Sequence, residues 1–223
     1  MKHVLAVALI LVGLPGSAQA AQFGNFIGSV VAEWLTDGRK MKLVEPFAYV
    51  DPHGRRWDAP RGSIVDGASI PKIAWSIIGG PFEGKYRDAS VIHDVACVER
   101  QREWQVVHDA FYTAMRASGV NQSQAKIMYA AVYHFGPRWP LVRVVSEVET
   151  ETRQVRVCIN MGLDKLVCYD APETTTKTVS RRTEIPPPEK TLTEGDFQRL
   201  ADRIENAESS GQSLSLEDIR NFR

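Results

Sequence analysis

Three short pieces of this sequence decide how its central domain is built: Asp66-Gly67-Ala68-Ser69-Ile70-Pro71, then His93-Asp94, then His108-Asp109. The first piece consists of turn-forming residues, and both His-Asp pairs lie in runs whose apolar residues have helical spacing. Three acidic and two imidazole side chains therefore fall within a segment that otherwise has the composition of a hydrophobic core.

A helix over residues 87–98 would gather its reactive side chains on one face. At 100° per residue, Ser90, His93, Asp94 and Cys97 follow the i, i+3, i+4, i+7 spacing, and most apolar residues fall on the other side. Such a stripe is either the solvated face of an amphipathic helix or a functional site. The His-Asp pair after a Gly-rich loop favours a site, because Lys, Glu or Gln would serve a face that needs only solubility.

A second helix, over residues 103–117, contains the other His-Asp pair. Its periodicity puts His108 at the edge of the core face, whereas Asp109 points nearly the opposite way and is expected to be solvated. His108 is therefore the better site candidate of the two. The alternative is a histidine that hydrogen-bonds a neighbouring carbonyl.

The first twenty residues have the pattern of a secretory signal. Lys2 and His3 precede an apolar run over 4–14, and Ala18-Gln19-Ala20 is a small-x-small cleavage site. The apolar run is too short to span a bilayer, and no second one follows. We therefore expect cleavage near Ala20 and a soluble periplasmic or secreted product without a transmembrane segment.

Charge and cysteine content limit the classes of binding partner and the cellular compartment that the sequence allows. Lys plus Arg and Asp plus Glu number 27 each, which leaves no basic footprint for nucleic acid. Cys158 and Cys168 lie in two alternating, strand-like runs joined by a turn, where a disulfide or two thiols would both fit. An exported protein favours the disulfide, and Cys97 is then the cysteine left over.

The order of the elements predicts an α+β fold: a small antiparallel β unit packed on a three-helix segment, then a β-hairpin and a helical C-terminal tail. Strands are expected over 41–50, 55–58 and 64–65, and helices over 87–98, 103–117 and 122–135. The expected division is 1–20 signal peptide, 21–140 core domain, 141–170 β-hairpin extension, 171–190 linker and 191–223 helical tail. The Thr/Pro/Glu-rich linker suggests that the tail folds separately, binds a protein partner or remains a solvated end.

Several of these motifs together resemble a known bacterial and phage family. The family is called domain of unknown function 1353, and the resemblance covers roughly residues 43–136. The motifs that carry it are Val65–Pro71, Trp75, Gly79-Gly80-Pro81, Tyr86, Ala89, His93-Asp94, Ala114-Met115 and Gly119-Val120. The resemblance implies a domain and a set of focal residues, but no reaction. It also reveals a departure, because the family usually has an acidic residue three positions before the aromatic Phe111, and His108 occupies that place here.

The helical His-Asp pair also resembles, over a shorter stretch, secreted phospholipases of the A-two class. That resemblance implies His93 as the base that activates water and Asp94 as a ligand of a divalent cation such as calcium. Asp66 or Asp109 would then be the carboxylate that orients the base. The phospholipases usually flank the pair with disulfide cysteines, whereas only Cys97 lies near it here.

Two functions remain open from the sequence. One is a binding or structural module, in which Asp66, His93 and Asp94 join the strands to the helices through a buried hydrogen-bond network. The other is a hydrolase in which neutral His93 is a general base, with Asp94, Asp66 and His108 or Asp109 around it and a divalent metal as cofactor. They differ in geometry, because a base must line an open cleft beside a carboxylate, whereas a structural histidine is buried.

Overall fold

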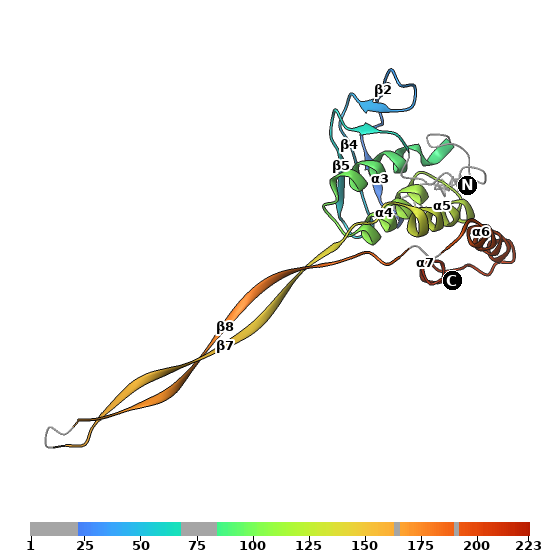
Figure 1. The fold of residues 1–223 in the computed structure, drawn as a ribbon. Coiled ribbons are helices and arrows are strands. Elements are labelled where there is room, and N and C mark those ends of the chain that lie inside the picture. Colours follow the sequence, from blue (N-terminus) through green and yellow to red (C-terminus); the bar gives the residue numbers. More distant parts are fainter. Residues whose placement is uncertain (1–21, 68–83, 163–165, 190–191) are drawn as a thin grey trace, which may run out of the picture. The chain divides into compact units, whose positions relative to one another are not determined.

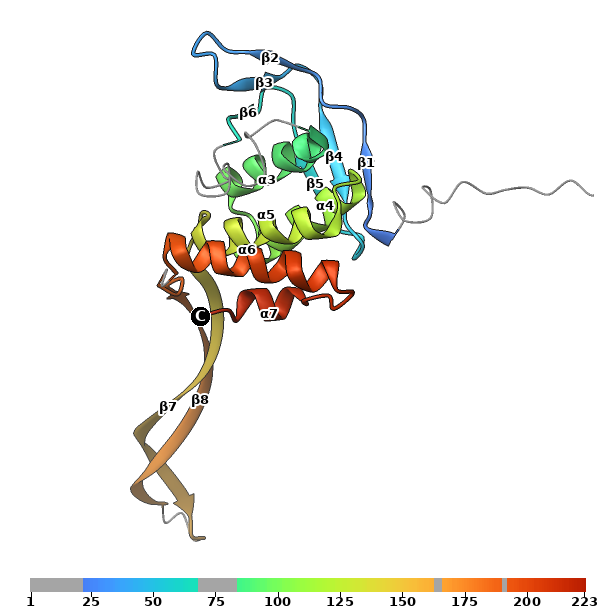
Figure 2. The same cartoon turned by 90° about the vertical axis from the view of Figure 1, so that its right-hand side faces the viewer.

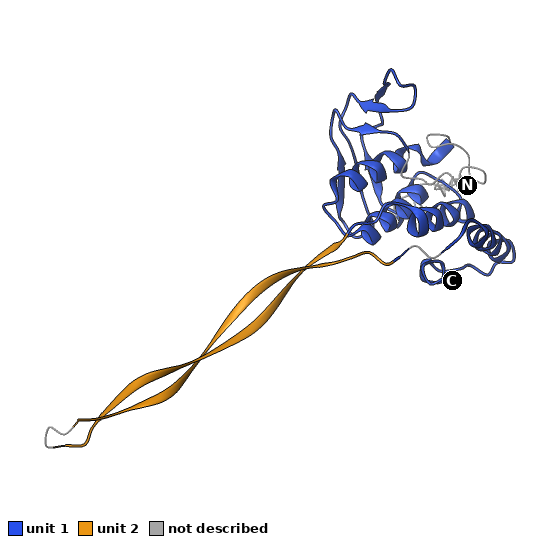
Figure 3. Cartoon of the chain, viewed as in Figure 1, with its two compact units in different colours: residues 1–139, 189–223 blue, residues 140–188 orange. Residues whose placement is uncertain are grey.

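The computed structural model describes residues 22–67, 84–162, 166–189 and 192–223 (Figure 1). The chain divides into two compact units, residues 1–139 with 189–223, and residues 140–188 (Figure 3). We call the first unit the head and the second the hairpin. Helices and antiparallel sheets both contribute, so the predicted α+β class is confirmed.

Two small antiparallel sheets begin the head. One has the order β1 (Asn25–Ile27), β4 (Phe47–Val50), β5 (Arg56–Ala59), and the other β2 (Ala32–Trp34), β3 (Met41–Leu43), β6 (Ile64–Val65). The single strand expected over 41–50 is therefore two strands, one in each sheet. Pro46, which has no N–H for a ladder, lies just before β4.

The turn between β4 and β5 forms as its residue types predict. The Asp51 carboxylate accepts hydrogen bonds from the backbone N–H groups of His53 and Arg55, at 2.9 and 3.0 Å, and Gly54 has a φ of 75°. The same carboxylate accepts a bond from the Trp57 indole at 3.1 Å. These bonds fix the β4–β5 hairpin beneath α3.

Three helices follow: α3 (Arg87–Glu99), α4 (Trp104–Ala117) and α5 (Gln122–Phe135). A short 3-10 turn over Gly84–Tyr86 leads into α3, which packs on β5 and β6, and α4 packs between α3 and α5. Asn121 caps α5 by accepting the Gln124 N–H at 2.8 Å, as the sequence predicts. The three predicted helices agree with those found to within one residue at each end.

The C-terminal tail forms two helices that belong to the head. α6 (Glu194–Ser209) and α7 (Leu216–Arg220) each start with a capping box, at Thr193 and Ser215, and both pack on α5 (Figure 2). Phe197 is buried against Phe135, with ring centroids 5.7 Å apart. The expectation of a separately folded or solvated tail is therefore wrong, because α5 of the same chain covers its apolar face.

The hairpin consists of two 20-residue strands, β7 (Leu141–Asn160) and β8 (Leu166–Ile185) (Figure 1). They pair in continuous antiparallel register from Leu141 opposite Ile185 to Asn160 opposite Leu166. Residues 171–185, which the sequence assigned to a linker, are strand instead. Their many Thr residues favour a strand, and only the Pro186-Pro187-Pro188 end keeps the extended linker character.

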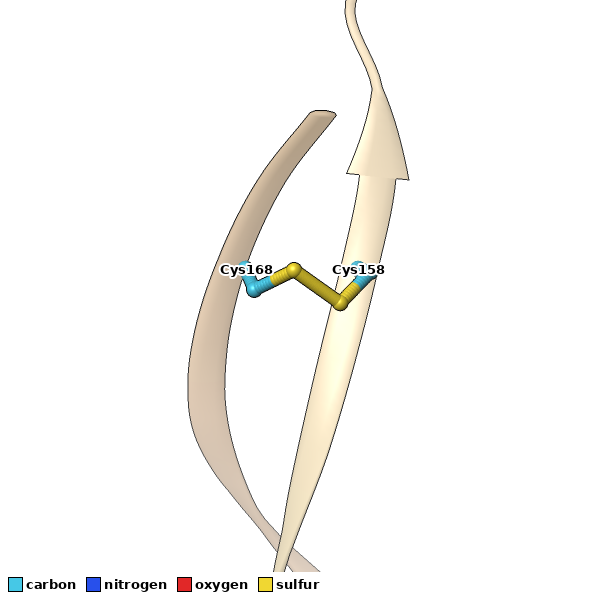
Figure 4. Close-up of a disulfide and its surroundings, with 2 residues drawn as sticks. All are labelled: Cys158 and Cys168. Carbon is cyan, nitrogen blue, oxygen red and sulfur yellow. A yellow bond between two sulfur atoms is a disulfide. The ribbon is translucent and has the colours of Figure 1, made fainter. Parts of the chain in front are cut away.

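A disulfide joins Cys158 and Cys168 across the two strands (Figure 4). The two residues are directly opposite in the register, and their Cα atoms are 4.0 Å apart. The predicted pairing is therefore confirmed, and Cys97 takes no part in it.

Among the described residues, no helix has the length and apolar character that crossing a membrane requires. The expected signal peptide over 1–20 and the Ala68–Pro81 part of the turn and loop motifs lie outside the described residues.

Candidate functional site

The polar stripe of α3 is buried. Ser90, His93, Asp94 and Cys97 are 1, 1, 4 and 5 % exposed, whereas Val98, which the periodicity placed with the core residues, is 77 % exposed. The stripe is not the solvated face of the helix, because α4 packs on α3 on one side and strands β5 and β6 on another. Periodicity showed that these residues share a face, but not what covers it.

Two histidines and a cysteine meet between α3 and α4. His93 Nε2 lies 2.8 Å from His108 Nδ1, and Cys97 Sγ lies 3.6 Å from His93 Nε2. One ligand atom from each of the three residues lies within 4.8 Å of the others, and His108 is fully buried. We call these residues the His-His-Cys cluster.

Hydrogen bonding fixes the proton positions in the cluster. His108 Nε2 lies 3.1 Å from the Pro137 carbonyl oxygen, which can only accept, so this nitrogen is the donor. Nδ1 of neutral His108 is then an acceptor, and His93 Nε2–H donates to it. The sequence left open that His108 hydrogen-bonds a neighbouring carbonyl. This is true of Nε2, whereas Nδ1 bonds His93.

Burial sets the charge state of His93. Removal from water disfavours the imidazolium and lowers the pKa of His93 to about 3. The ring is therefore neutral at physiological pH, and a neutral imidazole can accept a proton or bind a metal ion. A base with so low a pKa is poorly matched to proton transfer near pH 7.

Asp94 ties α3 to the turn that follows β6. Its Oδ2 accepts a 2.7 Å hydrogen bond from the backbone N–H of Gly67, the residue after Asp66. Gly67 has a φ of 61°, in the left-handed region that glycine adopts without strain. The Asp66-Gly67 turn and the His93-Asp94 pair therefore lie together, with the Asp94 carboxylate directed to backbone.

Asp109, the alternative orienting carboxylate, belongs to a different set of contacts. Its Oδ1 accepts hydrogen bonds from the Tyr129 hydroxyl and from Arg220 Nη2, each at 2.8 Å. It joins α4 to α5 and α7, and its side chain is about one-third exposed. The expectation that Asp109 is simply solvated is wrong, since it is ion-paired, and it does not orient His93.

Among the described residues, the hydrogen-bonding neighbours of the His93 ring are His108 and Cys97. A cavity of about 280 Å³ lies between β5, α3 and α4, and Ile92 and Ala96 line it, but the three cluster residues do not. The geometry expected of a general base, an open cleft with a carboxylate at hydrogen-bond distance, is therefore not found in the described part of the chain.

The donor atoms of the cluster are nitrogen and sulfur. Calcium takes six to eight oxygen ligands, so this cluster does not suit it. Imidazole and thiolate are ligands that suit zinc and copper. Cys97 was noted in the sequence as part of the stripe, but its place beside two imidazoles depends on the packing of α4 on α3, for which the sequence carries no local signal.

Comparison with known proteins agrees with the motifs. Residues 41–132 match the family described as "Protein of unknown function (DUF1353)". The matched segment lies in the head. It contains β3 to β6 and α3 and α4, together with most of α5, and so includes the whole His-His-Cys cluster and Asp94.

Two curated relatives come from Sinorhizobium fredii strain NGR234. The chain is 38 % identical to "Uncharacterized protein y4jT" over 221 residues, which cover 96 % of this chain and 63 % of the relative. It is 36 % identical to "Uncharacterized protein y4iH" over 150 residues, which cover 62 % of this chain and 63 % of the relative. The chain therefore matches less than two thirds of the length of either relative.

No solved structure matches the chain. None of the relatives supports the likeness to phospholipases. The site must therefore be interpreted from its own geometry.

Proposed function

We propose that this chain is an exported structural and binding module rather than a hydrolase. In this proposal the buried polar groups of α3 and α4 hold the head together, and the hairpin contacts a protein partner. The observation that carries the proposal is the closed environment of His93, which is 1 % exposed and bonded to His108 rather than to a carboxylate.

The scaffold role is supported by the elements that the buried polar groups connect. His108 reaches from α4 to the Pro137 carbonyl beyond α5, and Asp94 reaches from α3 to the turn after β6. Each bond joins segments that are far apart in the sequence. A buried donor or acceptor that loses its partner costs about 1–3 kcal/mol, so these bonds help to select one arrangement of the helices.

The binding role is supported by one face of the hairpin. Opposite residues of an antiparallel pair share a face, and three rungs near the disulfide pair apolar residues on the same face: Val155 with Ala171, Val157 with Tyr169 and Ile159 with Val167. The rungs between them, Arg156 with Asp170 and the disulfide, lie on the other face. This alternation is typical of a strand with one covered face, yet Ile159, Val167 and Tyr169 are 46, 43 and 49 % exposed.

The chemistry of this face favours a protein as its partner. The hairpin has as many acidic as basic residues, which offers no attraction to nucleic acid or to an anionic membrane surface. An aromatic side chain with a hydroxyl, surrounded by aliphatic residues, is typical of the centre of a protein interface. Export is supported by the disulfide and by the signal pattern at the N-terminus.

Replacing His93 tests the scaffold role. His93→Ala leaves the buried His108 Nδ1 without its donor, so we expect a loss of about 1–3 kcal/mol in the free energy of unfolding. For a chain of this size, that corresponds to about 2–4 °C in the melting midpoint for each kcal/mol. The control is His53→Ala, in an exposed turn, which should leave the midpoint unchanged. An unchanged midpoint for His93→Ala as well would refute the scaffold role.

Site-specific photocrosslinking tests the binding role. A crosslinker at Val157 lies on the apolar face, and one at Thr174 lies on the opposite face of the hairpin. We expect a protein from the exported fraction of the native host to be crosslinked from Val157 but not from Thr174, and Tyr169→Lys should abolish the product. Equal crosslinking from both faces would contradict a specific interface.

A further inference from the structure

We propose that His93, Cys97 and His108 form a buried binding site for a transition metal ion, with Zn²⁺ as the ion that fits best. The inference deepens the scaffold role and rests on it, because the ion would tie α3 to α4 at the place where the two histidines now meet. Three residues of the types that bind zinc in proteins, His93, Cys97 and His108, converge here from two helices, at 1, 5 and 0 % exposure.

The spacing of the donor atoms is close to that of a zinc site. Zn–N bonds of about 2.05 Å and a Zn–S bond of about 2.3 Å at tetrahedral angles give N···N near 3.4 Å and N···S near 3.6 Å. The His93 Nε2 to Cys97 Sγ distance is 3.6 Å, and His93 Nε2 to His108 Nδ1 is 2.8 Å. For these two pairs, binding requires the imidazoles to separate by about half an ångström, and all three donor atoms already lie within 4.8 Å of one another.

The backbone of the helices already places two of the donors. His93 and Cys97 are four residues apart on α3, so their side chains lie one above the other on the same face. His108 comes from α4, which packs directly on α3. No rearrangement of the fold is needed to bring the third donor to the other two.

A second hydrogen bond orients the His108 ring. Ligand histidines in metal sites almost always donate their other ring N–H to a carbonyl or a carboxylate, which fixes the tautomer. His108 Nε2 donates to the Pro137 carbonyl at 3.1 Å, so Nδ1 directs its lone pair into the cluster. Pro137 is thus a positioning residue for the site through its backbone oxygen.

Binding requires defined proton movements. The Cys97 thiol loses its proton to solvent, and the His93 proton moves from Nε2 to Nδ1 so that Nε2 can coordinate the ion. His108 keeps the proton on Nε2, which still donates to the Pro137 carbonyl oxygen. The ion then has two neutral imidazoles and one thiolate as ligands, and one proton is released for each ion bound.

The experiment uses the purified full-length chain with Zn²⁺ or Co²⁺ alone as the probe. We expect one Zn²⁺ for each chain by elemental analysis, a higher melting midpoint with Zn²⁺ than with a chelator, and a thiolate-to-cobalt charge-transfer band with Co²⁺. Cys97→Ser keeps the size of the side chain and should abolish that band and weaken Zn²⁺ binding by at least about 100-fold, the upper end for loss of a supporting partner alone.

Matched controls separate this site from other ligands in the chain. His53→Gln removes an exposed histidine, and Asp94→Asn changes the carboxylate that binds Gly67, so both should retain one Zn²⁺ and the cobalt band. Reduction of the hairpin disulfide should not add to the band if Cys97 alone supplies the thiolate.

The outcomes distinguish this inference from the scaffold role. A folded chain that binds no Zn²⁺, or a Cys97→Ser variant that binds it as well as the native chain, overturns the metal site. If His93→Ala still lowers the melting midpoint in chelator, the scaffold role stands without the metal. If Zn²⁺ binds but His93→Ala neither releases it nor changes the midpoint, both are wrong.

Discussion

The ion pair between Lys126 and Glu208 offers the sharpest test of how the tail joins the head. Lys126 Nζ donates to Glu208 Oε1 and to the Ser213 hydroxyl, each at 2.5 Å, and the Lys126 and Glu208 side chains are 5 and 17 % exposed. Burial would raise the pKa of Glu208, but hydrogen bonds from Lys126, Ser213 and Gln122 outweigh it and lower the pKa. The pair therefore holds α6 on α5 as two charged groups.

Glu208→Ala leaves the Lys126 ammonium buried with one partner fewer. Breaking a buried ion pair from one side costs about 3–5 kcal/mol. Because Ser213 remains as an acceptor and Glu208 is partly exposed, we expect a loss of about 3 kcal/mol.

Urea unfolding followed by tryptophan fluorescence measures this loss in the head, because all five tryptophans lie outside residues 140–188. The matched control is Asp58→Ala, which breaks the exposed Arg56–Asp58 pair of the head and should cost less than about 1 kcal/mol. The double change Lys126→Met with Glu208→Leu should recover most of the loss. If Glu208→Ala costs no more than Asp58→Ala, the tail does not depend on this pair and the reasoning is wrong.

Three further outcomes are expected. Asp94→Ala removes the charged acceptor of the Gly67 N–H and should cost about 1.5–3 kcal/mol in the same urea assay, and a loss below about 0.5 kcal/mol would contradict the role of this bond. Replacing Cys158 and Cys168 by Ser opens a 10-residue loop worth about 2.7 kcal/mol in chain entropy, so amide exchange should speed up in the hairpin while the urea midpoint of the head stays the same. Burial lowers the pKa of His134 below the usual value of about 6.5, so the unfolded state binds the proton more readily. The head should therefore lose stability as pH falls below about 6.5, and His134→Gln should reduce the dependence of its stability on pH.

The helices of the head could be predicted because their signals are local. Residues 87–98, 103–117 and 122–135 have apolar periodicity bounded by Gly, Asn or Pro, and α3, α4 and α5 follow these limits closely. The strands were harder. β1 and β2 have three residues each, too few for a period of two to be visible, and their pairing with β4 and β3 is non-local.

The position of the tail could not be predicted from local sequence patterns either, although the composition of α5 offered one indication. α5 is buried from Ala125 to Val132 without interruption, and Lys126 is the one charged residue in that run. A helix that is apolar nearly all round lies at the centre of a bundle. Such a helix needs a cover on its second side, and α6 with α7 supplies it. The composition of residues 171–190 suggested a linker instead, and so separated the tail from the helix that it covers.

The candidate site was predicted in its members but not in its arrangement. His93, Asp94 and His108 were identified because reactive residues cluster on two helical faces, and His93 and His108 do meet. The two carboxylates bind elsewhere: Asp94 accepts a hydrogen bond from the Gly67 N–H, and Asp109 accepts from Tyr129 and Arg220. Which polar groups pair is decided by the packing of α3 on α4, which depends on contacts across the whole head.

Position 108 determines what the cluster can do. The resemblance to the family implies an acidic residue at this place, and here it is a histidine whose Nδ1 lies 2.8 Å from His93 Nε2. A carboxylate at that distance would hold a neighbouring imidazole in the orientation that a general base needs, whereas an imidazole adds a second nitrogen donor beside the Cys97 sulfur. A carboxylate at position 108 would therefore pair with His93, whereas His108 gives the nitrogen and sulfur donor set of the proposed metal site. One side chain on α4 therefore decides whether the cluster offers His93 a carboxylate or a second nitrogen donor.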